Sequence, residues 1–187
     1  MKPFRDTLWK MTIKTQTEMH IHGGVKISGV QGLMKRDQKF IIPGSTLKGK
    51  WRDALRSIQG TACIQGYGDR KCGCLSCRVF GEGGFSPSII RISDCIEKKG
   101  EETKAARIRT QIAIDRFRKT AREGALAFVE TVPEGTIFEG SVRLTVRDLT
   151  EKEIAMLKAA AECLLVSIGS GVSRGLGNVK IALEVME

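Results

Sequence analysis

Four cysteines lie within fifteen residues of each other and are the residues in this sequence best suited to chemistry. Cys63, Cys72, Cys74 and Cys77 stand in "CIQGYGDRKCGCLSC", where the last two form a C-x-x-C pair. Such a pair can grip one metal ion, and the other two thiolates can complete a tetrahedral site. Because no fifth ligand is nearby, we expect a closed, structural zinc site that folds a polar, glycine-rich loop. A thioredoxin-like redox pair and four unrelated thiols are the alternatives.

A helix is predicted after the turn "IIPGS", with Ser45 or Thr46 as its cap. The positions expected to share its apolar face are Leu47, Trp51, Leu55 and Ile58. The basic positions that recur every four residues on another face are Lys48, Arg52 and Arg56. This stripe suits contacts with the phosphates of a nucleic acid backbone, which carry no sequence information.

A glycine-rich loop, "GSGVSRGLG" at residues 169–177, is a second candidate binding element. Its glycines let a backbone approach a ligand closely, while Ser170, Ser173 and Arg174 supply hydrogen bonds to a phosphate or sugar. The loop follows a predicted helix and precedes a predicted strand, so it is not a dinucleotide-binding fingerprint. The alternative is a helix C-cap followed by a turn.

Two histidines stand two residues apart in "MHIHGG", so His20 and His22 are predicted to point to the same side of a strand. A metal or catalytic role would need a carboxylate that the neighbouring sequence does not supply. We therefore expect the pair to line an RNA surface or to cap the turn. The remaining cysteines, Cys95 and Cys163, are predicted to be core residues.

The elements that must position these residues follow from periodicity. Alternation predicts strands in "TLWKMTIKTQTEMHI", "SIIRISDCI", "TIFEGSVRLTVRD" and "NVKIALEV". A second helix is predicted in "TEKEIAMLKAAAECLLVSIG", with Thr150 and Glu153 as a capping box and Gly169 at its end. The predicted core residues of these segments are Trp9, Met11, Ile13, Val142, Leu144, Val146, Ile154, Leu157, Leu164, Leu165, Ile168, Val179, Ile181, Leu183 and Val185. The order predicts an α+β, ferredoxin-like (RRM-like) sheet with helices on one face.

A protruding β-hairpin is predicted where "TQIAID" and "ALAFVETV" flank the basic turn "RFRKTAREG". Its cationic residues are Arg116, Arg118, Lys119 and Arg122. Residues 97–110, before the hairpin, are charged and loop-like at first. We therefore predict a single domain over residues 1–187, with a zinc-binding insertion at 61–82 and a thumb-like hairpin at 107–131.

The charge is basic and unevenly spread along the chain. The net charge is +10, with 12 Lys/Arg against 4 Asp/Glu in residues 1–60, 13 against 9 in 61–130, and 6 against 8 in 131–187. Such asymmetry indicates a basic face for nucleic acid, the alternative being a role in solubility alone. No apolar run reaches the ~20 residues of a membrane span, and "MKPFRDTLWK" lacks the features of a signal peptide. We expect a cytoplasmic protein without a membrane partner.

Four segments together resemble the RAMP superfamily of CRISPR-associated proteins and, more narrowly, the repeated backbone subunit of type III effector complexes. The family's helix start appears as "IPGSTLKGKWR" and its cysteine-rich insertion as "CGCLSCRVFG". Its thumb hairpin appears as "IDRFRKTAREGALAFVETVPEGTIF", and its glycine-rich loop as "GSGVSRGLGNVKI". The four occur in the family's order and cover nearly the whole chain.

The resemblance implies an RRM-like subunit that binds guide RNA, with copies stacked head to tail along one CRISPR RNA and each thumb displacing a base pair of the guide–target duplex. It implies as partners the guide RNA, the target RNA, further copies of the chain and other effector subunits. The aromatic content of 5% argues against a sequence-specific binder that stacks many bases. The residues expected to contact RNA are His20, His22, Ser45, Thr46, Lys48, Lys50, Arg52, Arg116, Arg118, Ser170, Gly171, Ser173 and Arg174.

The resemblance also bears on cleavage. The catalytic aspartate of slicing members aligns with Gln31, and Asp37 aligns with a second, non-catalytic aspartate. Because glutamine can neither act as a base nor hold a cation as a carboxylate does, we expect no catalytic residue here, an Asp37 ion pair with Lys35 or Arg36, and a separate nuclease as partner. This pattern fits the smaller systems derived from type III-D, including type VII. The alternatives are a metal-dependent slicer that uses Asp37, and a free-standing zinc-containing regulator that binds nucleic acid.

Overall fold

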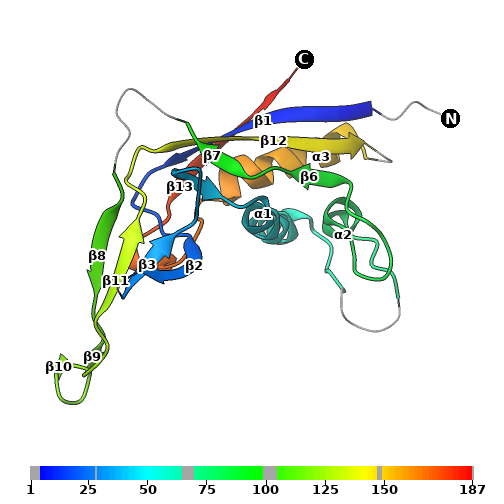
Figure 1. Cartoon of the computed structure of the whole chain (residues 1–187). Helices are drawn as coiled ribbons and strands as arrows, with labels where there is room; N and C mark the ends of the chain where they lie inside the picture. The colour runs from blue at the N-terminus through cyan, green and yellow to red at the C-terminus, as the bar shows by residue number, and fades with distance from the viewer. Residues whose placement is uncertain (1–4, 28, 65–69, 99–104, 147–148, 187) are drawn as a thin grey trace.

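The fold is seen in a computed structural model that describes residues 5–27, 29–64, 70–98, 105–146 and 149–186 (Figure 1). Parts of four predictions lie outside these ranges: the ends of the domain 1–187, residues 65–69 of the cysteine-rich insertion, residues 99–104 of the charged loop, and residues 147–148 of a predicted strand. No helix within the described ranges is long and apolar enough to cross a membrane.

One antiparallel sheet forms the main body of the protein. Its strand order is β13 (Val179–Val185), β1 (Arg5–Thr15), β12 (Ile137–Val146), β7 (Cys95–Glu97), β5 (Lys39–Ile42) and β4 (Lys35–Arg36), with β6 (Ile90–Ile92) also paired to β12. The predicted alternation of β1 is confirmed, because Trp9, Met11 and Ile13 are buried. Strand β1 thus buries the apolar side chains of one of its faces in the core.

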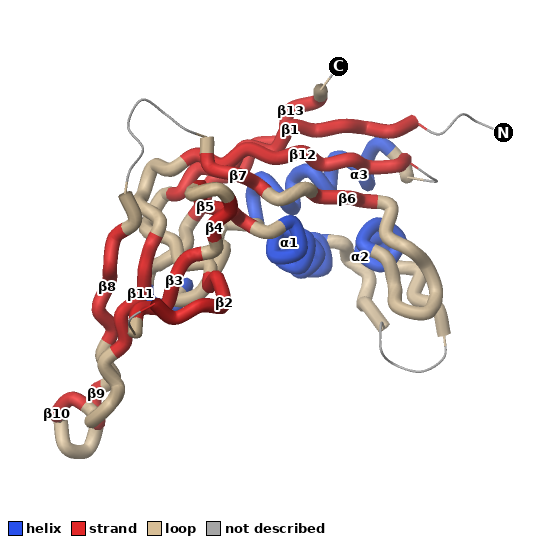
Figure 2. Tube along the Cα trace, viewed as in Figure 1, coloured by secondary structure: helices blue, strands red, loops and turns tan. Residues whose placement is uncertain are grey.

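Two helices cover one face of this sheet (Figures 1 and 2): α1 (Gly44–Ile58) and α3 (Glu151–Ala159). Trp51 of α1 joins them, since its indole Nε1 donates to the carbonyl oxygen of Leu157 at 2.8 Å. Its ring lies 6.5 Å from that of Trp9 below and 6.1 Å from that of Phe80 of α2 (Leu75–Phe80). Strands and helices therefore share one core, and the predicted α+β class is confirmed.

The second helix starts as predicted but ends earlier. Thr150 and Glu153 form the expected capping box, yet the α-helix ends at Ala159 and passes into a π-helical turn, Ala160–Leu164. The chain then extends, so Gly169 does not end the helix and Leu164 is exposed. Two other predicted core residues are also exposed, Ile58 at 37% and Val185 at 67%, because each stands at the end of its element.

The predicted strand at 88–96 is divided into β6 and β7 by a bulge. Ile92 lies opposite Val142 and Ile96 opposite Glu139. A step of four residues on this segment therefore matches a step of three residues on β12, which leaves one extra residue. A bulge of this kind bends a strand and redirects the side chains at the extra residue. Here the redirected segment contains Asp94, which faces the start of α1.

A second sheet carries the hairpin away from the main body (Figures 1 and 2). Its order is β2 (His22–Ile27), β3 (Val30–Leu33), β11 (Ala127–Thr131) and β8 (Arg107–Gln111). Two short strands, β9 (Ile114–Asp115) and β10 (Thr120–Ala121), pair near the tip. The hairpin and the cysteine-containing loop next to α2 lie at opposite ends of the molecule.

Candidate functional site

The start of α1 is capped from outside the helix. Its N-cap residue is Pro43, and no side chain of the helix makes a cap hydrogen bond, so the prediction that Ser45 or Thr46 caps it is wrong. Asp94 does this work instead, since its carboxylate accepts the Gly44 N–H at 3.0 Å. That N–H and the Arg36 guanidinium hold the pKa of the Asp94 carboxyl below its usual value.

Gly44 is required for this close approach. A Cβ atom at this position would lie 2.3 Å from the carbonyl oxygen of Ile92, at the edge of the bulge. No local pattern pointed to Asp94 as a cap, because it lies 50 residues from Gly44 along the chain. Ser45 is exposed and Thr46 half-buried at the helix start, where their hydroxyls are not used as caps.

The predicted basic stripe of α1 divides into residues with different environments. Lys50 is exposed and Lys48 half-buried. Burial, with the nearby Arg52 charge, lowers the pKa of Lys48. Arg56 lies 3.7 Å from the Asp53 carboxylate, and Arg52 turns toward the cysteines. Lys48 of the stripe and Lys50, which lies outside it, are therefore the α1 cations that best fit a surface contact.

The glycine-rich loop is pinned to the segment that contains His20. Ser170 N–H donates to the His20 carbonyl oxygen at 2.9 Å, and a Cβ at Gly169 would lie 2.3 Å from the same oxygen. Beyond it, Gly171 and Gly175 have left-handed backbone conformations on either side of a single 3-10 turn. The side chains that this turn leaves exposed belong to Ser170, Ser173 and Arg174.

The two histidines have neighbouring rings but different surroundings. Their ring centroids lie 5.9 Å apart, as expected for side chains on one side of a strand. His22 is exposed, whereas His20 is only 1% exposed and its Nδ1 lies 2.6 Å from the carbonyl oxygen of Glu130. The prediction that both line a surface therefore fails for His20, because this residue connects the glycine-rich loop to strand β11.

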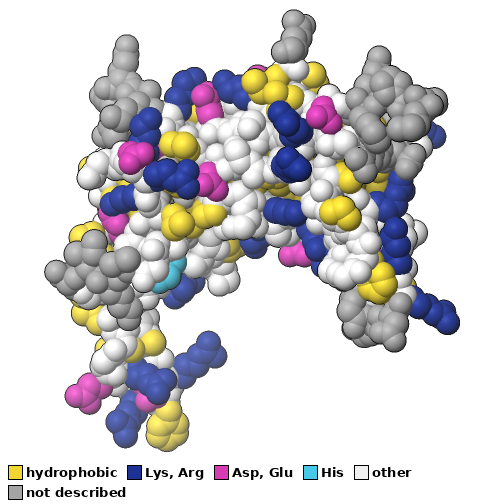
Figure 3. Space-filling model, turned by 45° about the vertical axis from the view of Figure 1, so that its right-hand side comes forward, with side chains coloured by type: hydrophobic (Ala, Val, Ile, Leu, Met, Phe, Trp, Pro, Cys, Tyr) yellow, Lys and Arg dark blue, Asp and Glu magenta, His cyan; other side chains and the backbone are white. Residues whose placement is uncertain are grey.

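The hairpin exposes its basic tip. Asp115 shapes the turn, because its carboxylate accepts the backbone N–H groups of Phe117 and Arg118 at 2.9 and 3.0 Å. The Phe117 side chain is 96% exposed, which rules out packing in the core in this conformation. The exposed cations around it are Arg116, Arg118, Lys119 and Arg122. Figure 3 shows this tip projecting from the body with its Lys and Arg side chains.

The residues at the aligned slicing positions lie on different elements. Gln31 is half-buried on β3, in register with Val129 of β11, and Asp37 is exposed at the turn between β4 and β5. The predicted ion pair of Asp37 is wrong: Lys35 pairs with Glu130, and Arg36 pairs with Asp94. Asp37 makes no ion pair with any residue that the structure describes.

Glu130 is a polar residue that the sequence did not single out. Its carboxylate accepts the Leu33 N–H at 2.9 Å and pairs with Lys35. Burial alone would raise the pKa of this carboxyl, but Lys35 and the Leu33 N–H together lower it. Glu130 thus joins β11 of the hairpin to β3 and to the strand that follows it.

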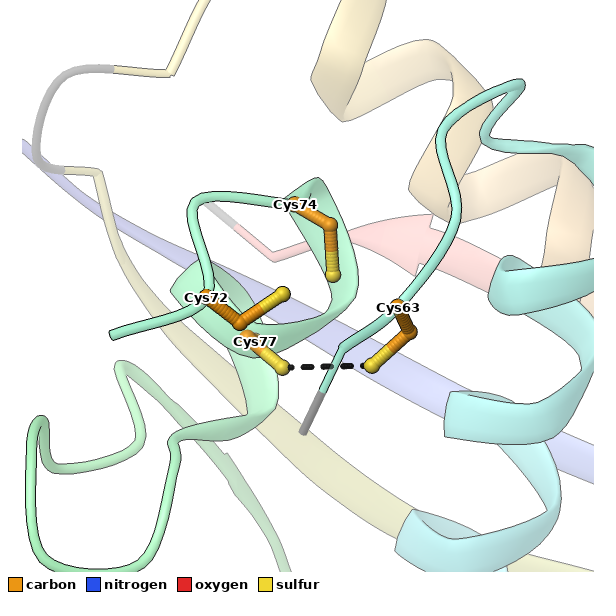
Figure 4. Close-up of side chains that lie close together, drawn as sticks. All are labelled: Cys63, Cys72, Cys74 and Cys77. Carbon is orange, nitrogen blue, oxygen red and sulfur yellow. Dashed lines mark hydrogen bonds between the residues drawn. The ribbon is translucent and has the colours of Figure 1, made fainter. Parts of the chain in front are cut away.

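Figure 4 shows Cys63, on the segment that follows α1, facing Cys72, Cys74 and Cys77, which lie just before and within α2. Their sulfur atoms all lie within 4.8 Å of one another, and Cys63 Sγ is 3.6 Å from Cys77 Sγ. Tetrahedral zinc with bonds of ~2.3 Å places its sulfur ligands about 3.8 Å apart. The donor set and its spacing therefore fit a zinc ion, as the sequence predicted.

The protein scaffold around the cysteines is buried and polar. Burial raises the pKa of the Cys77 thiol to about 12 and raises that of Cys74, whereas the Cys74 N–H lowers the pKa of Cys72. The Glu82 carboxylate, itself buried, accepts the Cys72 N–H at 2.8 Å. Binding of a metal ion to these thiols would release their protons, because the thiolate is the form that coordinates.

The other two cysteines differ from each other. Cys95 is fully buried, as predicted, and burial raises its thiol pKa to about 12. Cys163 is exposed, because it lies in the π-helical turn that rotates it away from the sheet, so its predicted core position is wrong.

The comparisons with known proteins agree with this arrangement. The model of the RAMP superfamily matches residues 12–180. A protein from Methanocaldococcus jannaschii named "CRISPR system Cms endoribonuclease Csm3" is 30% identical over 186 residues, which cover 90% of this chain and 75% of the relative. The chain therefore belongs to the RAMP superfamily, among its Csm3-like CRISPR-associated members.

Proposed function

We propose that this chain is a backbone subunit that binds guide RNA, stacks head to tail with further copies along it, and presents it for pairing with target RNA. The observation that carries the proposal is the hairpin tip, where a fully exposed Phe117 stands among four exposed cations. Exposing a phenylalanine is costly for a monomer, but a wedge of this kind can separate stacked bases once cations have drawn in the phosphates. Other effector subunits complete the assembly.

The proposed core is RRM-like. The elements β1, α1, β6/β7, β12, α3 and β13 follow one another along the chain, with β13, β1, β12 and β6/β7 as neighbours in the sheet. This order supports the split βαβ arrangement of ferredoxin-like folds. The hairpin and the zinc-binding loop are then insertions at the two ends of one domain.

Sequencing of the RNA that copurifies with the full chain tests the proposal. The expected result is RNA of regular length on a particle that contains several copies of the chain. A discrete oligomer without RNA would instead support the free-standing regulator. The regular length matters because each added copy covers a fixed number of nucleotides.

The proposed guide contacts are to phosphates and sugars. They are made by Lys48, Lys50, Ser45, Thr46 and His22 near α1 and β2, and by Ser170, Gly171, Ser173 and Arg174 of the glycine-rich loop. Four members of the first group lie in the first two turns of α1 and His22 begins β2, whereas the loop exposes hydroxyls and one cation. Apart from the His22 imidazole, neither group offers an exposed aromatic face for reading bases, which suits guides of variable sequence.

Replacing Lys48 and Lys50 with methionine is expected to weaken RNA binding equally for unrelated sequences. Each lost phosphate contact flattens the dependence of log affinity on log salt by about one unit. Fluorescence anisotropy at several salt concentrations measures both effects. Lys180→Met is the control, because this exposed lysine lies on β13 and belongs to neither group of proposed contacts. A marked sequence preference in the unaltered protein would argue against backbone contacts.

We further propose that the chain does not cut RNA and that a separate nuclease does. Gln31 stands where the resemblance places a catalytic aspartate, and an amide cannot replace a carboxylate as base or cation ligand. Two observations favour the slicing alternative: the relative is named an endoribonuclease, and the exposed Asp37 makes no ion pair among the described residues. The two candidates are separated by experiment.

The complex assembled on guide RNA is expected to leave complementary target RNA intact in magnesium or manganese. Denaturing gels of labelled target give the result. Regularly spaced fragments that disappear with Asp37→Ala but persist with Asp53→Ala, an exposed acid on α1, would establish the slicing alternative. Fragments that persist in both variants would point to a contaminating nuclease.

A further inference from the structure

Arg52 turns away from the basic face of α1 and reaches the cysteine cluster. Its Nη2 atom donates to the carbonyl oxygen of Gly81 at 2.7 Å and to the sulfur of Cys77 at 3.6 Å. Gly81 ends α2, the helix that contains Cys77. One guanidinium therefore holds both a thiol of the cluster and the end of the helix that carries it.

The carbonyl oxygen that Arg52 binds has a fixed position. Gly81 has a φ of 86°, and a Cβ atom there would lie 2.7 Å from the backbone nitrogen of Ser88. Only glycine fits this packing, so the chain cannot shift locally without moving the neighbouring strand connection. The guanidinium is consequently anchored on the protein side and aimed at Cys77.

The negative charge expected at the zinc centre would be stabilised by a nearby positive side chain. Four thiolates around one divalent zinc ion leave a net charge of −2 at the centre. The Glu82 carboxylate, which accepts the Cys72 N–H and is only 5% exposed, adds a further negative group beside it. In a buried setting such charge is destabilising unless a fixed positive group offsets it. Arginine remains charged under all conditions of interest, and its planar fork can hold two acceptors at once.

We propose that Arg52 is a positioning residue of the zinc centre, where it fixes the Cys77 thiolate and offsets the charge of the site. This role rests on the proposed zinc centre. The sequence had suggested Arg52 as an RNA contact, whereas this proposal assigns it to the zinc centre. Through Arg52 the zinc centre would also hold α1 in place. Lys48 and Lys50, the proposed RNA contacts, lie on the turn of α1 just before Arg52.

Zinc affinity of the full chain without RNA tests the proposal, by competition with a chromogenic chelator. Arg52→Met removes the charge and the donor but keeps most of the side-chain volume. The expected effect is a ~10–100-fold loss of zinc affinity, the range found for residues that support metal ligands. Arg52→Lys is expected to recover part of the loss, since an ammonium keeps the charge but cannot span both acceptors. Arg91→Met, at an exposed arginine on β6, is the charge-matched control and is expected to bind zinc normally.

Cobalt substitution gives a readout that a purely structural role would not change. A hydrogen bond to a thiolate lowers the energy of its lone pairs, so Arg52→Met is expected to shift the sulfur-to-cobalt charge-transfer band to longer wavelength. If Arg52→Met does not fold, the band and affinity of Arg52→Lys decide. Unchanged affinity and an unchanged band would overturn the role of Arg52 while leaving the zinc centre intact. An unaltered protein that binds no zinc would overturn both.

Discussion

Cys74→Ser is expected to reduce the zinc content of the purified chain from one ion per molecule to near zero. The variant leaves three thiolates in a site whose scaffold has no replacement donor among the residues found to cluster there. Structural zinc in small peptides binds with an apparent free energy of ~10–16 kcal/mol. Loss of about half of it would exceed the 0.5–3 kcal/mol of an ordinary substitution, so the thermal midpoint should fall by several degrees or more.

Elemental analysis by mass spectrometry and thermal unfolding with and without chelator measure these two effects. Cys163→Ser is the matched control, because that cysteine is exposed in the π-helical turn and is not one of the four that cluster. Zinc near zero in the unaltered protein, or full zinc in Cys74→Ser, would rule out the centre.

The zinc affinity is also expected to rise with pH through the neutral range. Burial raises the pKa of Cys77 to about 12 and raises that of Cys74, so both thiols keep their protons in the metal-free protein at neutral pH. Zinc must displace these protons, and each proton released makes the affinity tenfold stronger per pH unit. A pH-independent affinity between pH 6 and 8 would contradict the thiol protonation that the buried site implies.

Deletion of residues 117–123 is expected to abolish regular assembly on guide RNA while leaving the chain folded. The deleted residues are exposed and include only the short strand β10 near the tip, beyond the pair β8 and β11, so the free energy of unfolding should change little. The loss removes the Phe117 wedge and three of the cations that draw phosphates to it. Negative-stain microscopy of chain and guide RNA measures the spacing of copies, and circular dichroism measures folding.

Phe117→Ala separates the wedge from the charge. It is expected to preserve binding of the chain to single-stranded guide RNA but to disturb the regular displacement of base pairs in the guide–target duplex. Phe85→Ala, at an exposed phenylalanine in the turn after α2, is the control. Normal spacing and normal duplex structure in the deletion variant would refute the thumb role of the hairpin.

Local patterns in the sequence predicted the elements well where neighbours along the chain decide the outcome. The alternation of β1 and the capping box of Thr150 and Glu153 are both found as expected, because each depends on residues within one element. The spacing of the four cysteines likewise anticipated a cluster whose sulfur atoms meet. Such features need no knowledge of distant contacts.

The features that sequence reasoning missed depend on residues that are far apart along the chain. Asp94 caps a helix that begins 50 residues earlier, and the Glu130 carboxylate binds a backbone N–H 97 residues away. Arg52 was placed on a basic face because periodicity describes the direction of a side chain and not what the fold brings near it. The end of α3 was missed for the same reason, since the glycine-rich loop draws the chain out of the helix.

The external cap of α1 separates two roles that usually fall on the same residues: capping the helix and contacting a binding partner. In most helices the first serine or threonine must hold the backbone, so changing it for any other purpose weakens the fold. Here the Asp94 carboxylate does that task from a bulge in the neighbouring strand, while Ser45 and Thr46 make no cap bond. Substitutions at Ser45 and Thr46 are therefore expected to leave the cap of α1 intact. Both positions can be changed to suit a binding partner without loss of a cap hydrogen bond.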